Sequence, residues 1–344
     1  MTKPAEKKSG HPENLHKQSI IIDGTCPLAN YKEYWQIYYQ GGVTVIAGTI
    51  NLPPELTRDT IRRVGNWIAK IRKNKDKMLQ VTSVEDIFRA KKENKLGIIF
   101  HFQGSTPFET DVNNVEIFHR LGLRMVQLTY NIKDFVGTGC AERADSGLSA
   151  FGLKVVAELN RLGIVVDCAH TGYKTTMDAI EASKKPVIIS HGNPRAVCDS
   201  KRNYPDDIIK AIAKKGGVIG LNGYPDFVSK KQQSSLDELI DHAEYVVKLV
   251  GIDHLSVGID YFWAQEGVST LEEATGFYNE HVKAGVWDAS VYNPPPLKYP
   301  KGIEMPEKIG NLTLALVKRG FSEEDVKKIM GLNIIRVFKE VWGR

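Results

Sequence analysis

Two histidines stand at equivalent positions, each shortly after a run of apolar, β-branched residues. The first run, residues 164–166, precedes His170, and the second, residues 187–189, precedes His191. An amphipathic segment at residues 172–183 separates them, which is typical of a βαβ unit with buried parallel strands. Polar residues at the carboxyl ends of such strands line the functional site. Either histidine alone could be a hydrogen-bonded structural residue, but the matched pair indicates a shared site.

The same rule adds polar candidates after the other expected strands. Two imidazoles and the carboxylate of Asp260 form a reasonable set of ligands for catalytic zinc, with one position left for water. Such a metal lowers the pKa of its water and polarises a carbonyl, which suits amide hydrolysis. Asp260 taken alone could instead cap a helix. The remaining strand-end candidates are Thr25, Pro27, Gln103, Tyr130 and Asn222.

Apolar runs and helical patterns alternate along the whole chain. Counting them gives eight strands with helices between them, which predicts an α/β fold, a (β/α)₈ TIM-type barrel. A helical extension is expected at residues 311–342, broken near Arg319 and Gly320 and capped by Ser322 together with Glu323 and Glu324. The expected strands lie near residues 19–23, 43–49, 96–102, 124–129, 164–166, 187–189, 217–221 and 255–259.

Length and composition fit one enzyme-like domain. The chain has 344 residues, of which 42% are hydrophobic and 25% charged, as is ordinary for a soluble globular protein. We expect a polar tail at residues 1–18, followed by a single barrel domain at residues 19–344. Residues 264–306 are rich in aromatics and prolines, which predicts an insertion that serves as a lid or as a homodimer surface.

Charge and cysteine usage exclude several classes of protein. The net charge of +5 comes partly from scattered lysines, and no basic stretch interleaved with aromatics indicates nucleic-acid binding. No apolar run is long enough to span a membrane, and the first residues lack the apolar core of a signal peptide. The four cysteines lie far apart with no CxxC pair, so we expect a reduced, cytoplasmic setting.

Several stretches resemble the membrane dipeptidase (renal dipeptidase) family of zinc peptidases. They read VVDCAHTGYKTT, PVIISHGNPRAVCDSKRNYPDD, GGVIGLN, DHLSVGID and NLTLALVKRGFSEEDVKKIMGLNIIRVF, and the match runs in order from about residue 19 to residue 342. The resemblance implies a (β/α)₈ barrel with two bridged zinc ions that hydrolyses dipeptides, including some with a D-residue at the carboxyl end. It also implies that His170 and His191 bind one zinc, that Asp260 is the carboxylate after the last strand, and that Arg202 holds the substrate carboxylate.

The sequence departs from the family at the other zinc. The family's first strand ends in D-G-H-x-D, which supplies two ligands, whereas residues 23–27 read DGTCP. Gln103 replaces the bridging glutamate, and Tyr130 replaces a histidine thought to steady the tetrahedral intermediate. Two close dications repel each other unless anionic ligands offset their charge. We therefore predict one zinc ion rather than two, held by His170 and His191 and completed by Asp260, Gln103 or water.

Two further residues are candidates to replace the lost ligands. Cys26 stands where those ligands were, and thiolate binds zinc well. His101 has the same strand parity as Gln103 and could also point inward. A histidine of the barrel core, bonded to a neighbouring polar group, is the simpler interpretation of His101.

The predicted function is a metal-dependent hydrolase that cleaves the amide bond of a dipeptide or a small N-acyl amino acid. Asp260 and Tyr130 are the candidate catalytic residues, while Arg202, Asn222 and Tyr130 are expected to bind substrate. A guanidinium group binds a carboxylate through two parallel hydrogen bonds, which fixes its orientation. One alternative is an inactive relative that binds a carboxylate-bearing, amino-acid-like ligand. Another is an altered reaction in which Tyr130 donates a proton with little or no metal.

Overall fold

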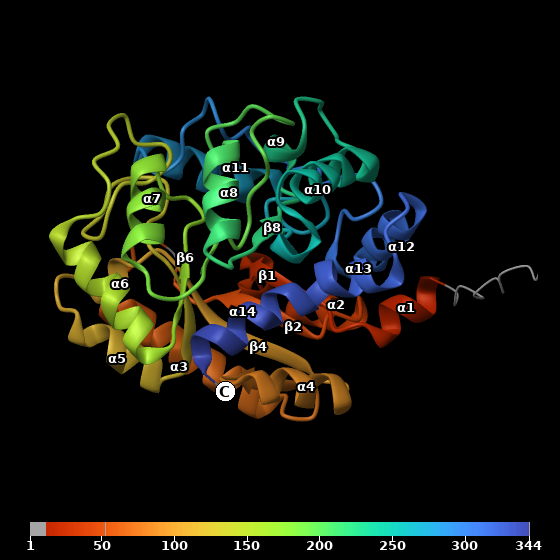
Figure 1. Ribbon diagram of the computed structural model, residues 1–344, viewed down its shortest axis with the longest axis horizontal. Coiled ribbons are helices and arrows are strands. Elements are labelled where there is room, and N and C mark those ends of the chain that lie inside the picture. Colours follow the sequence, from red (N-terminus) through yellow and green to blue (C-terminus); the bar gives the residue numbers. More distant parts are fainter. Residues whose placement is uncertain (1–11, 52, 344) are drawn as a thin grey trace, which may run out of the picture.

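The computed structural model describes residues 12–51 and 53–343, in which parallel strands curl into a barrel with helices around it (Figure 1). One sheet has the strand order β1-β2-β4-β5-β6-β7, and β8 pairs with β9 in a second sheet. All of these pairings are parallel. The strands are β1 Ile22–Cys26, β2 Val45–Thr49, β3 Met78–Val81, β4 Leu96–Gln103, β5 Leu123–Gln127, β6 Val165–Asp167, β7 Val187–Ile188, β8 Ile219–Leu221 and β9 Leu255–Val257.

Hydrogen bonds outside the regular ladders join the two sheets. On one side, a parallel bridge links Ile189, just after β7, to Ile219 in β8. On the other side, Asp23 Oδ1 in β1 accepts a hydrogen bond of 2.9 Å from the main-chain N–H of Ile259, just after β9. The strands therefore close into the barrel that the sequence predicted.

One strand was not predicted. Strand β3 pairs with the first half of β4, where Val81 lies opposite Ile99, and β5 pairs with the second half, where Phe100 lies opposite Leu123. Strand β4 can serve both neighbours because it has eight residues, all of them buried. The short strand β3 thus pairs with one edge of β4 and is not one of the eight strands that form the closed barrel.

The helices follow the expected alternation. Serine hydroxyls begin several of them; Ser83 and Ser235, for example, each form a capping box with an acidic residue three positions later. The helices are α1 Pro12–Gln18, α2 Trp35–Gln40, α3 Thr57–Lys73, α4 Val84–Lys92, α5 Asn113–Arg120, α6 Ala150–Leu162, α7 Tyr173–Ala182, α8 Asp206–Lys214, α9 Pro225–Val228, α10 Leu236–Val250, α11 Leu271–Lys283, α12 Gly310–Lys318, α13 Glu323–Lys327 and α14 Asn333–Trp342. In the parts of the chain described, none of these helices is long and apolar enough to cross a bilayer.

The carboxyl-terminal extension closes the amino end of the barrel. The buried cluster that contains Ile22, Val45 and Ile99 of the barrel also contains Ile334 and Phe338 of α14. Ser322 caps α13, as expected, but its partner is Asp325, not Glu323 or Glu324. Because α14 occupies this end, the opposite end of the barrel is left for the site.

The polar tail predicted at residues 1–18 needs correction from Pro12 onward. Residues 12–18 form α1, in which Leu15 and His16 are buried. His16 contacts Thr313 Oγ1 of α12 through Nδ1 at 2.7 Å, and it contacts the carbonyl oxygen of Gly41 through Nε2 at 2.8 Å. These contacts depend on residues distant in sequence, so the local pattern could not show them. Residues 1–11 of the predicted tail lie outside the described part of the chain.

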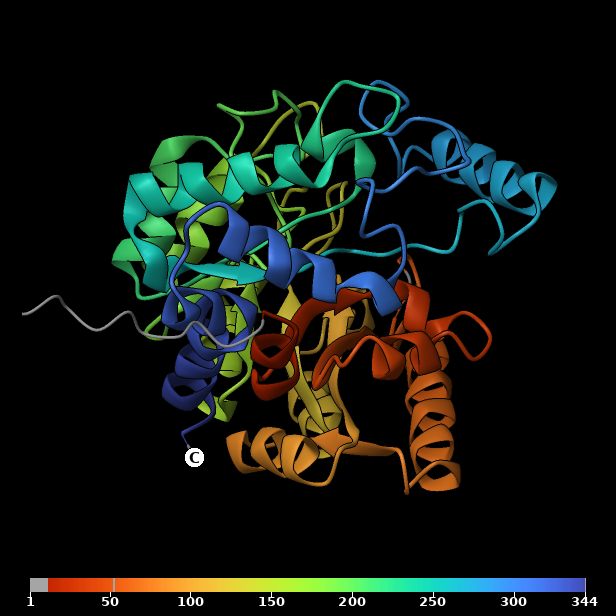
Figure 2. The ribbon, with the colours of Figure 1, turned by 90° about the vertical axis from the view of Figure 1, so that its right-hand side faces the viewer.

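The expected insertion at residues 264–306 contains helix α11, which stands to one side of the barrel (Figure 2). The segment after α11 returns to the barrel end opposite α14, where Trp287 and Tyr292 are buried. The insertion therefore covers the carboxyl ends of the strands.

The burial of Asp23 at the barrel seam makes stability depend on pH. Burial raises the pKa of its carboxyl to about 7, above the usual value of 3.8, although hydrogen bonds lower it in part. A raised pKa in the folded state means that the protonated form is favoured in the fold. The resulting stabilisation is present at low pH and is lost as the pH rises through 7.

We predict that Asp23→Asn, which keeps an oxygen for Ile259 but cannot ionise, becomes more stable relative to the wild type as the pH rises. Between about pH 5 and pH 8, the difference in the free energy of unfolding should shift by about 2 kcal/mol in favour of the variant. Urea unfolding at both pH values measures this shift. Asp59→Asn, at a solvent-exposed position on α3, is the control and should follow the wild type. Parallel pH profiles for wild type and Asp23→Asn would contradict the assignment.

Candidate functional site

The two strand-end histidines meet. His170 follows β6 and His191 follows β7, and their Nε2 atoms lie 2.9 Å apart. Burial and, to a lesser degree, the charge of Arg202 hold the pKa of both imidazoles well below its usual value. Both rings are therefore neutral, which is the form of histidine that binds a metal ion.

The carboxylate of Asp167 aligns both histidines. Its Oδ1 accepts hydrogen bonds of 2.9 Å from the main-chain N–H groups of Ala169 and Ser190, the residues that directly precede them. Burial alone would raise the pKa of Asp167, but the hydrogen bond and charge of His101 lower it, so the group is ionised. His101 Nε2 lies 3.1 Å from Asp167 Oδ2 across the barrel. His101 thus has the polar partner that its structural interpretation requires.

Asn131, which follows β5, fixes the tautomer of His170. Its side-chain oxygen lies 2.7 Å from His170 Nδ1 and also accepts a hydrogen bond of 3.1 Å from the hydroxyl of Tyr292. An amide oxygen can only accept, so His170 carries its hydrogen on Nδ1 and presents the lone pair of Nε2 to the site. Metal-binding histidines in general are oriented by a hydrogen bond of this kind. Sequence analysis missed this role of Asn131, although its place beside Tyr130 at a strand end was a usable signal.

Asp260 completes the set of possible ligands. Its Oδ2 lies 3.9 Å from His191 Nε2. Burial raises the pKa of Asp260 to about 8, although the charge of Arg202 lowers it in part. A desolvated carboxyl of this kind is stabilised as an anion by a nearby cation. His170 and Asp260 both have a left-handed backbone, with φ of 63° and 62°, a conformation that is uncommon for side-chain-bearing residues.

The side chains of His170, His191 and Asp260 are chemically suited to hold one metal ion, but the distances between them differ from those of a formed metal site. Two neutral imidazoles and a carboxylate are a common zinc set. Within residues 12–51 and 53–343, however, no group of three or more histidine, cysteine or acidic side chains is already spaced as metal ligands. His170, His191 and Asp260 would need small side-chain shifts to surround a cation.

Two of the residues that replace the family's ligands to the second metal, Gln103 and Thr25, form a hydrogen bond with each other. Gln103 Nε2 donates to Thr25 Oγ1 at 2.6 Å. Neither group carries a charge that could offset a second dication. The thiol of Cys26 donates to the main-chain oxygen of Asp23 at 3.6 Å, and burial raises its pKa well above the usual value. These residues do not fit a two-metal centre.

Arg202 carries a buried charge with no partner. Its side chain is 1% exposed, and none of its three guanidinium nitrogens has a hydrogen-bond partner among the described residues. Its guanidinium carbon lies 5.2 Å from the ring centroid of Phe227, which supplies only a cation–π contact. An unpaired buried charge is costly, and an anion bound beside it would offset that cost.

Aromatic side chains leave little space at the mouth of the barrel. The cavity there, about 40 Å³, is lined by Gln103, Tyr130, His170, Asp260 and Trp287 among others. The Tyr130 ring stacks on His170 with centroids 4.2 Å apart, and its hydroxyl accepts a hydrogen bond of 3.3 Å from Trp287 Nε1. Burial raises the pKa of Tyr130, so its hydroxyl stays protonated.

Asn222 is buried in the loop after β8 and does not line this cavity. Its side-chain oxygen accepts a hydrogen bond of 2.7 Å from the main-chain N–H of Tyr224, while its Nδ2 has no partner. The oxygen therefore serves the loop, and only the amide nitrogen remains free for another group.

The insertion is tied to the loop that carries Arg202. Asp288 forms an ion pair of 2.8 Å with Lys201, and Asn131 Nδ2 donates to the carbonyl oxygen of Val286 at 3.0 Å.

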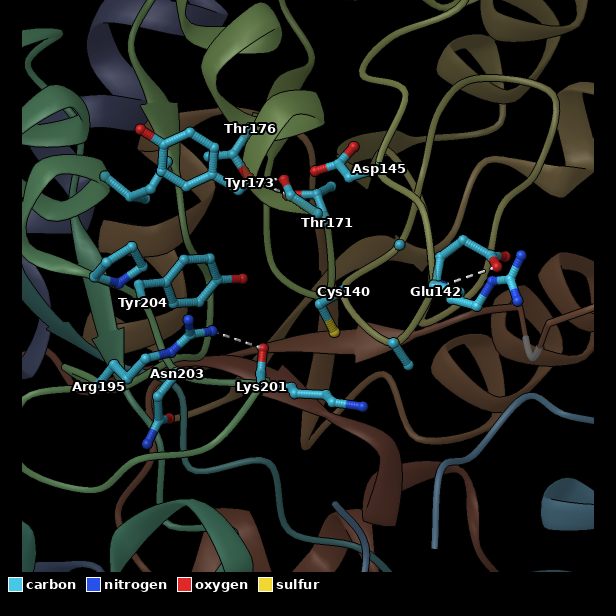
Figure 3. Close-up of a pocket in the computed structure, with 16 residues that line it drawn as sticks. Cys140, Glu142, Asp145, Thr171, Tyr173, Thr176, Arg195, Lys201, Asn203 and Tyr204 are labelled. Carbon is cyan, nitrogen blue, oxygen red and sulfur yellow. Dashed lines mark hydrogen bonds between the residues drawn. The ribbon is translucent and has the colours of Figure 1, made fainter. Parts of the chain in front are cut away.

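Lys201 also lines a separate, polar pocket of about 510 Å³, together with Cys140, Arg195 and Tyr204 (Figure 3). That pocket shares no lining residue with the mouth cavity.

Comparison with known proteins shows what the chain is similar to. The model of the membrane dipeptidase family, peptidase family M19, matches residues 13–281 and 296–342. An uncharacterised dipeptidase of Schizosaccharomyces pombe is 27% identical over 296 residues, which are 84% of this chain and 64% of that protein. Dipeptidase tcpJ of Claviceps purpurea is 28% identical over 287 residues, covering 83% and 60%. The chain thus spans about three fifths of the length of these curated relatives.

Solved structures agree with this result. An amidohydrolase from Pseudomonas aeruginosa superposes with a TM-score of 0.87 at 35% identity, over 97% of this chain and 99% of that one. A metallo peptidase from Rhodobacter sphaeroides, liganded with a phosphinate mimic of the dipeptide L-Ala-D-Ala, shares the fold with a TM-score of 0.79 at 18% identity, over 94% and 100%. The family match includes both strand-end histidines and the Arg202 loop, and the chain belongs to the membrane dipeptidase family, peptidase family M19.

Proposed function

We propose that the protein is a metal-dependent hydrolase that cleaves the amide bond of a dipeptide or a small N-acyl amino acid with a free carboxylate. The observation that carries this proposal is the unpaired, buried guanidinium of Arg202 beside the two neutral imidazoles. A carboxylate would supply the missing partner through two parallel hydrogen bonds. The named dipeptidases among the relatives support the same reaction.

His170, His191 and Asp260 would hold one zinc ion, with Gln103 beside them. When bound, the ion supplies Lewis acidity toward the substrate carbonyl and lowers the pKa of water. Burial and the charge of Arg202 keep the two imidazoles neutral, while the hydrogen bonds of Asp167 and Asn131 orient them. Without a metal ion, burial raises the pKa of Asp260 to about 8, and a bound cation would lower that pKa and hold the group as a carboxylate. The carboxylate oxygen that does not bind the ion would take a proton from the attacking water and return it to the leaving amine.

Tyr130 is placed to stabilise the developing oxyanion. Its hydroxyl oxygen accepts a hydrogen bond from Trp287, which leaves its own hydrogen free to donate toward the mouth cavity. The raised pKa keeps that hydrogen in place at neutral pH. A preorganised donor in a site closed to water is an effective source of transition-state stabilisation. Trp287 and Tyr292 of the insertion provide the closure.

A second candidate function is binding of an amino-acid-like carboxylate without hydrolysis. The neutral Gln103–Thr25 hydrogen bond favours it, because the charged groups of a two-metal centre are absent there.

We also propose that the protein works in the cytoplasm and that the insertion forms a homodimer surface. The four free cysteines support a reducing compartment.

Arg202→Lys keeps the charge but loses the planar fork, so we expect affinity for an N-acyl amino acid to fall by about 1–3 kcal/mol in calorimetry. The methyl ester of the same ligand should be insensitive to the change. Arg195→Lys is the matched control, since that guanidinium donates to the main-chain oxygen of Ser200 in the same loop. Unchanged affinity in Arg202→Lys would reject the carboxylate anchor.

Arg202→Met separates an anchor from a structural arginine. Removing an unpaired buried charge should raise the stability of the ligand-free protein by about 1–3 kcal/mol, while carboxylate binding is lost. Urea unfolding with and without ligand measures both effects. A large loss of stability in the ligand-free variant would show that Arg202 mainly supports the fold.

His170→Ala and His191→Ala should each remove zinc from protein purified without chelator, with the far-ultraviolet circular dichroism unchanged. Barrel stability comes mainly from buried apolar surface, so the fold should survive. His119→Ala, on the outer helix α5, serves as the control and should keep its metal. Full zinc content in both site variants would show that the pair has a structural role.

Restoring the lost ligands should restore the second metal. Thr25→His, Pro27→Asp and Gln103→Glu together supply two terminal ligands and an anionic bridge, so zinc content should rise from at most one toward two per chain. Gln103→Glu alone should stay at one, because a lone Thr25 hydroxyl is a weak ligand. Elemental analysis after dialysis measures the change. Two metals in the wild-type protein would contradict this interpretation of Gln103.

A further inference from the structure

A second cavity adjoins the mouth of the barrel. It has a volume of about 440 Å³ and shares Pro53 and Tyr130 with the mouth cavity. The mouth itself offers only about 40 Å³, little more than the space of one water molecule. A larger substrate group would have room to extend past Tyr130 into this adjoining cavity.

The walls of the adjoining cavity are mainly apolar. They include Pro54, Leu56, Ile132, Phe135 and Val286. Leu56 and Phe135 are 45% and 48% exposed, although large apolar side chains gain by burial. Apolar groups that remain exposed around a cavity mark a binding surface when an apolar ligand can cover them.

The charged groups of this cavity do not favour a charged ligand. Asp134 uses Oδ1 to accept the main-chain N–H groups of Val136 at 2.8 Å and Gly137 at 3.2 Å, which forms a turn. Its Oδ2 is buried and has no hydrogen-bond partner within the described part of the chain, so that oxygen is not exposed to an incoming group. Lys133 is exposed at the rim. An uncharged, apolar group is thus the occupant that these walls favour.

The order of the subsites follows from the anchors. Under the proposed function, the substrate carboxylate would lie at Arg202 and the amide at the histidine pair. Of these two histidines, His170 is the one whose ring stacks against Tyr130. The acyl part continues away from the carboxylate, past Tyr130, toward the shared wall of the adjoining cavity. We propose that this cavity is the acyl subsite, and that the preferred substrate is an amide whose acyl part carries a bulky apolar group. This inference rests on the function proposed above.

The insertion helps to build this subsite. Val286 lines the adjoining cavity and Trp287 lines the mouth cavity, so the two neighbouring residues stand on either side of the junction. Both lie within residues 282–295, which the family model does not match. The insertion therefore contributes Val286 to the cavity, while its other walls come from the segments around Pro53 and Ile132.

The test compares the hydrolysis of N-acetyl-, N-phenylacetyl- and N-octanoyl-alanine, each as the D- and the L-enantiomer, by the zinc-loaded, full-length protein. We expect kcat/KM to rise at least tenfold from the acetyl to the larger acyl groups, because each buried methylene adds to transition-state binding. Binding of the same compounds, measured by calorimetry, should rise in the same order.

Leu56→Asp and Phe135→Asp should each lower the ratio of kcat/KM for large over small acyl groups about tenfold, with little effect on the acetyl compound. Leu56 is the residue that precedes α3 and its side chain makes no capping hydrogen bond, so aspartate suits this position and the fold should not suffer. Ile61→Asp is the matched control, because Ile61 lies on the same helix, is 43% exposed and does not line the cavity.

The outcomes separate this inference from the proposed function. Hydrolysis without an acyl-size preference, or a preference that Leu56→Asp and Phe135→Asp leave unchanged, would overturn the acyl subsite and leave the hydrolase standing. Size-dependent binding that both variants abolish, with no hydrolysis of any compound, would support the subsite and overturn the hydrolase. Absence of both binding and hydrolysis would overturn both.

Discussion

The carboxylate of Asp167 is the constraint on which the site depends. Buried at the end of β6, it bonds the main chain just before His170 and just before His191, and it contacts His101 from β4. Three separate strands are therefore set relative to one anion. Because a buried carboxylate must have all its partners in place, the two imidazoles can meet only where this arrangement puts them.

The rest of the site concentrates features that cost stability. Arg202 has no partner, and His170 and Asp260 have left-handed backbones. An apolar residue at Arg202 and relaxed turns would make a more stable barrel. Such costs are tolerated where binding or catalysis needs them, and a large apolar core offsets them elsewhere. The barrel filled at one end by α14 supplies that core.

The positions of the strand ends could be predicted well from the sequence. Alternating apolar and helical patterns placed the barrel strands and both histidines, because local periodicity reports burial directly. The roles of Asp167 and Asn131 could not be found in that way, since each depends on hydrogen bonds between distant segments. Helix α1 was missed for the same reason, because its buried His16 contacts Thr313 of α12. Strand β3 was missed because its four residues are too few to show a clear periodicity. The hydrogen bond between Gln103 and Thr25 joins residues far apart in the sequence, so local patterns could not predict it either.

The attachment of the insertion to Asn131 has a kinetic consequence. The oxygen of Asn131 that orients His170 also accepts from Tyr292, and its nitrogen donates to Val286, so the covering segment and the metal-facing ring share one amide. Under the proposed function, a substrate that enters on the side of the covering segment would displace these contacts, and His170 would then lose part of its support. Entry by that route and chemistry would belong to different conformations. Association with substrate would be gated by this segment and slower than diffusion, and the escape of products would pass the same gate.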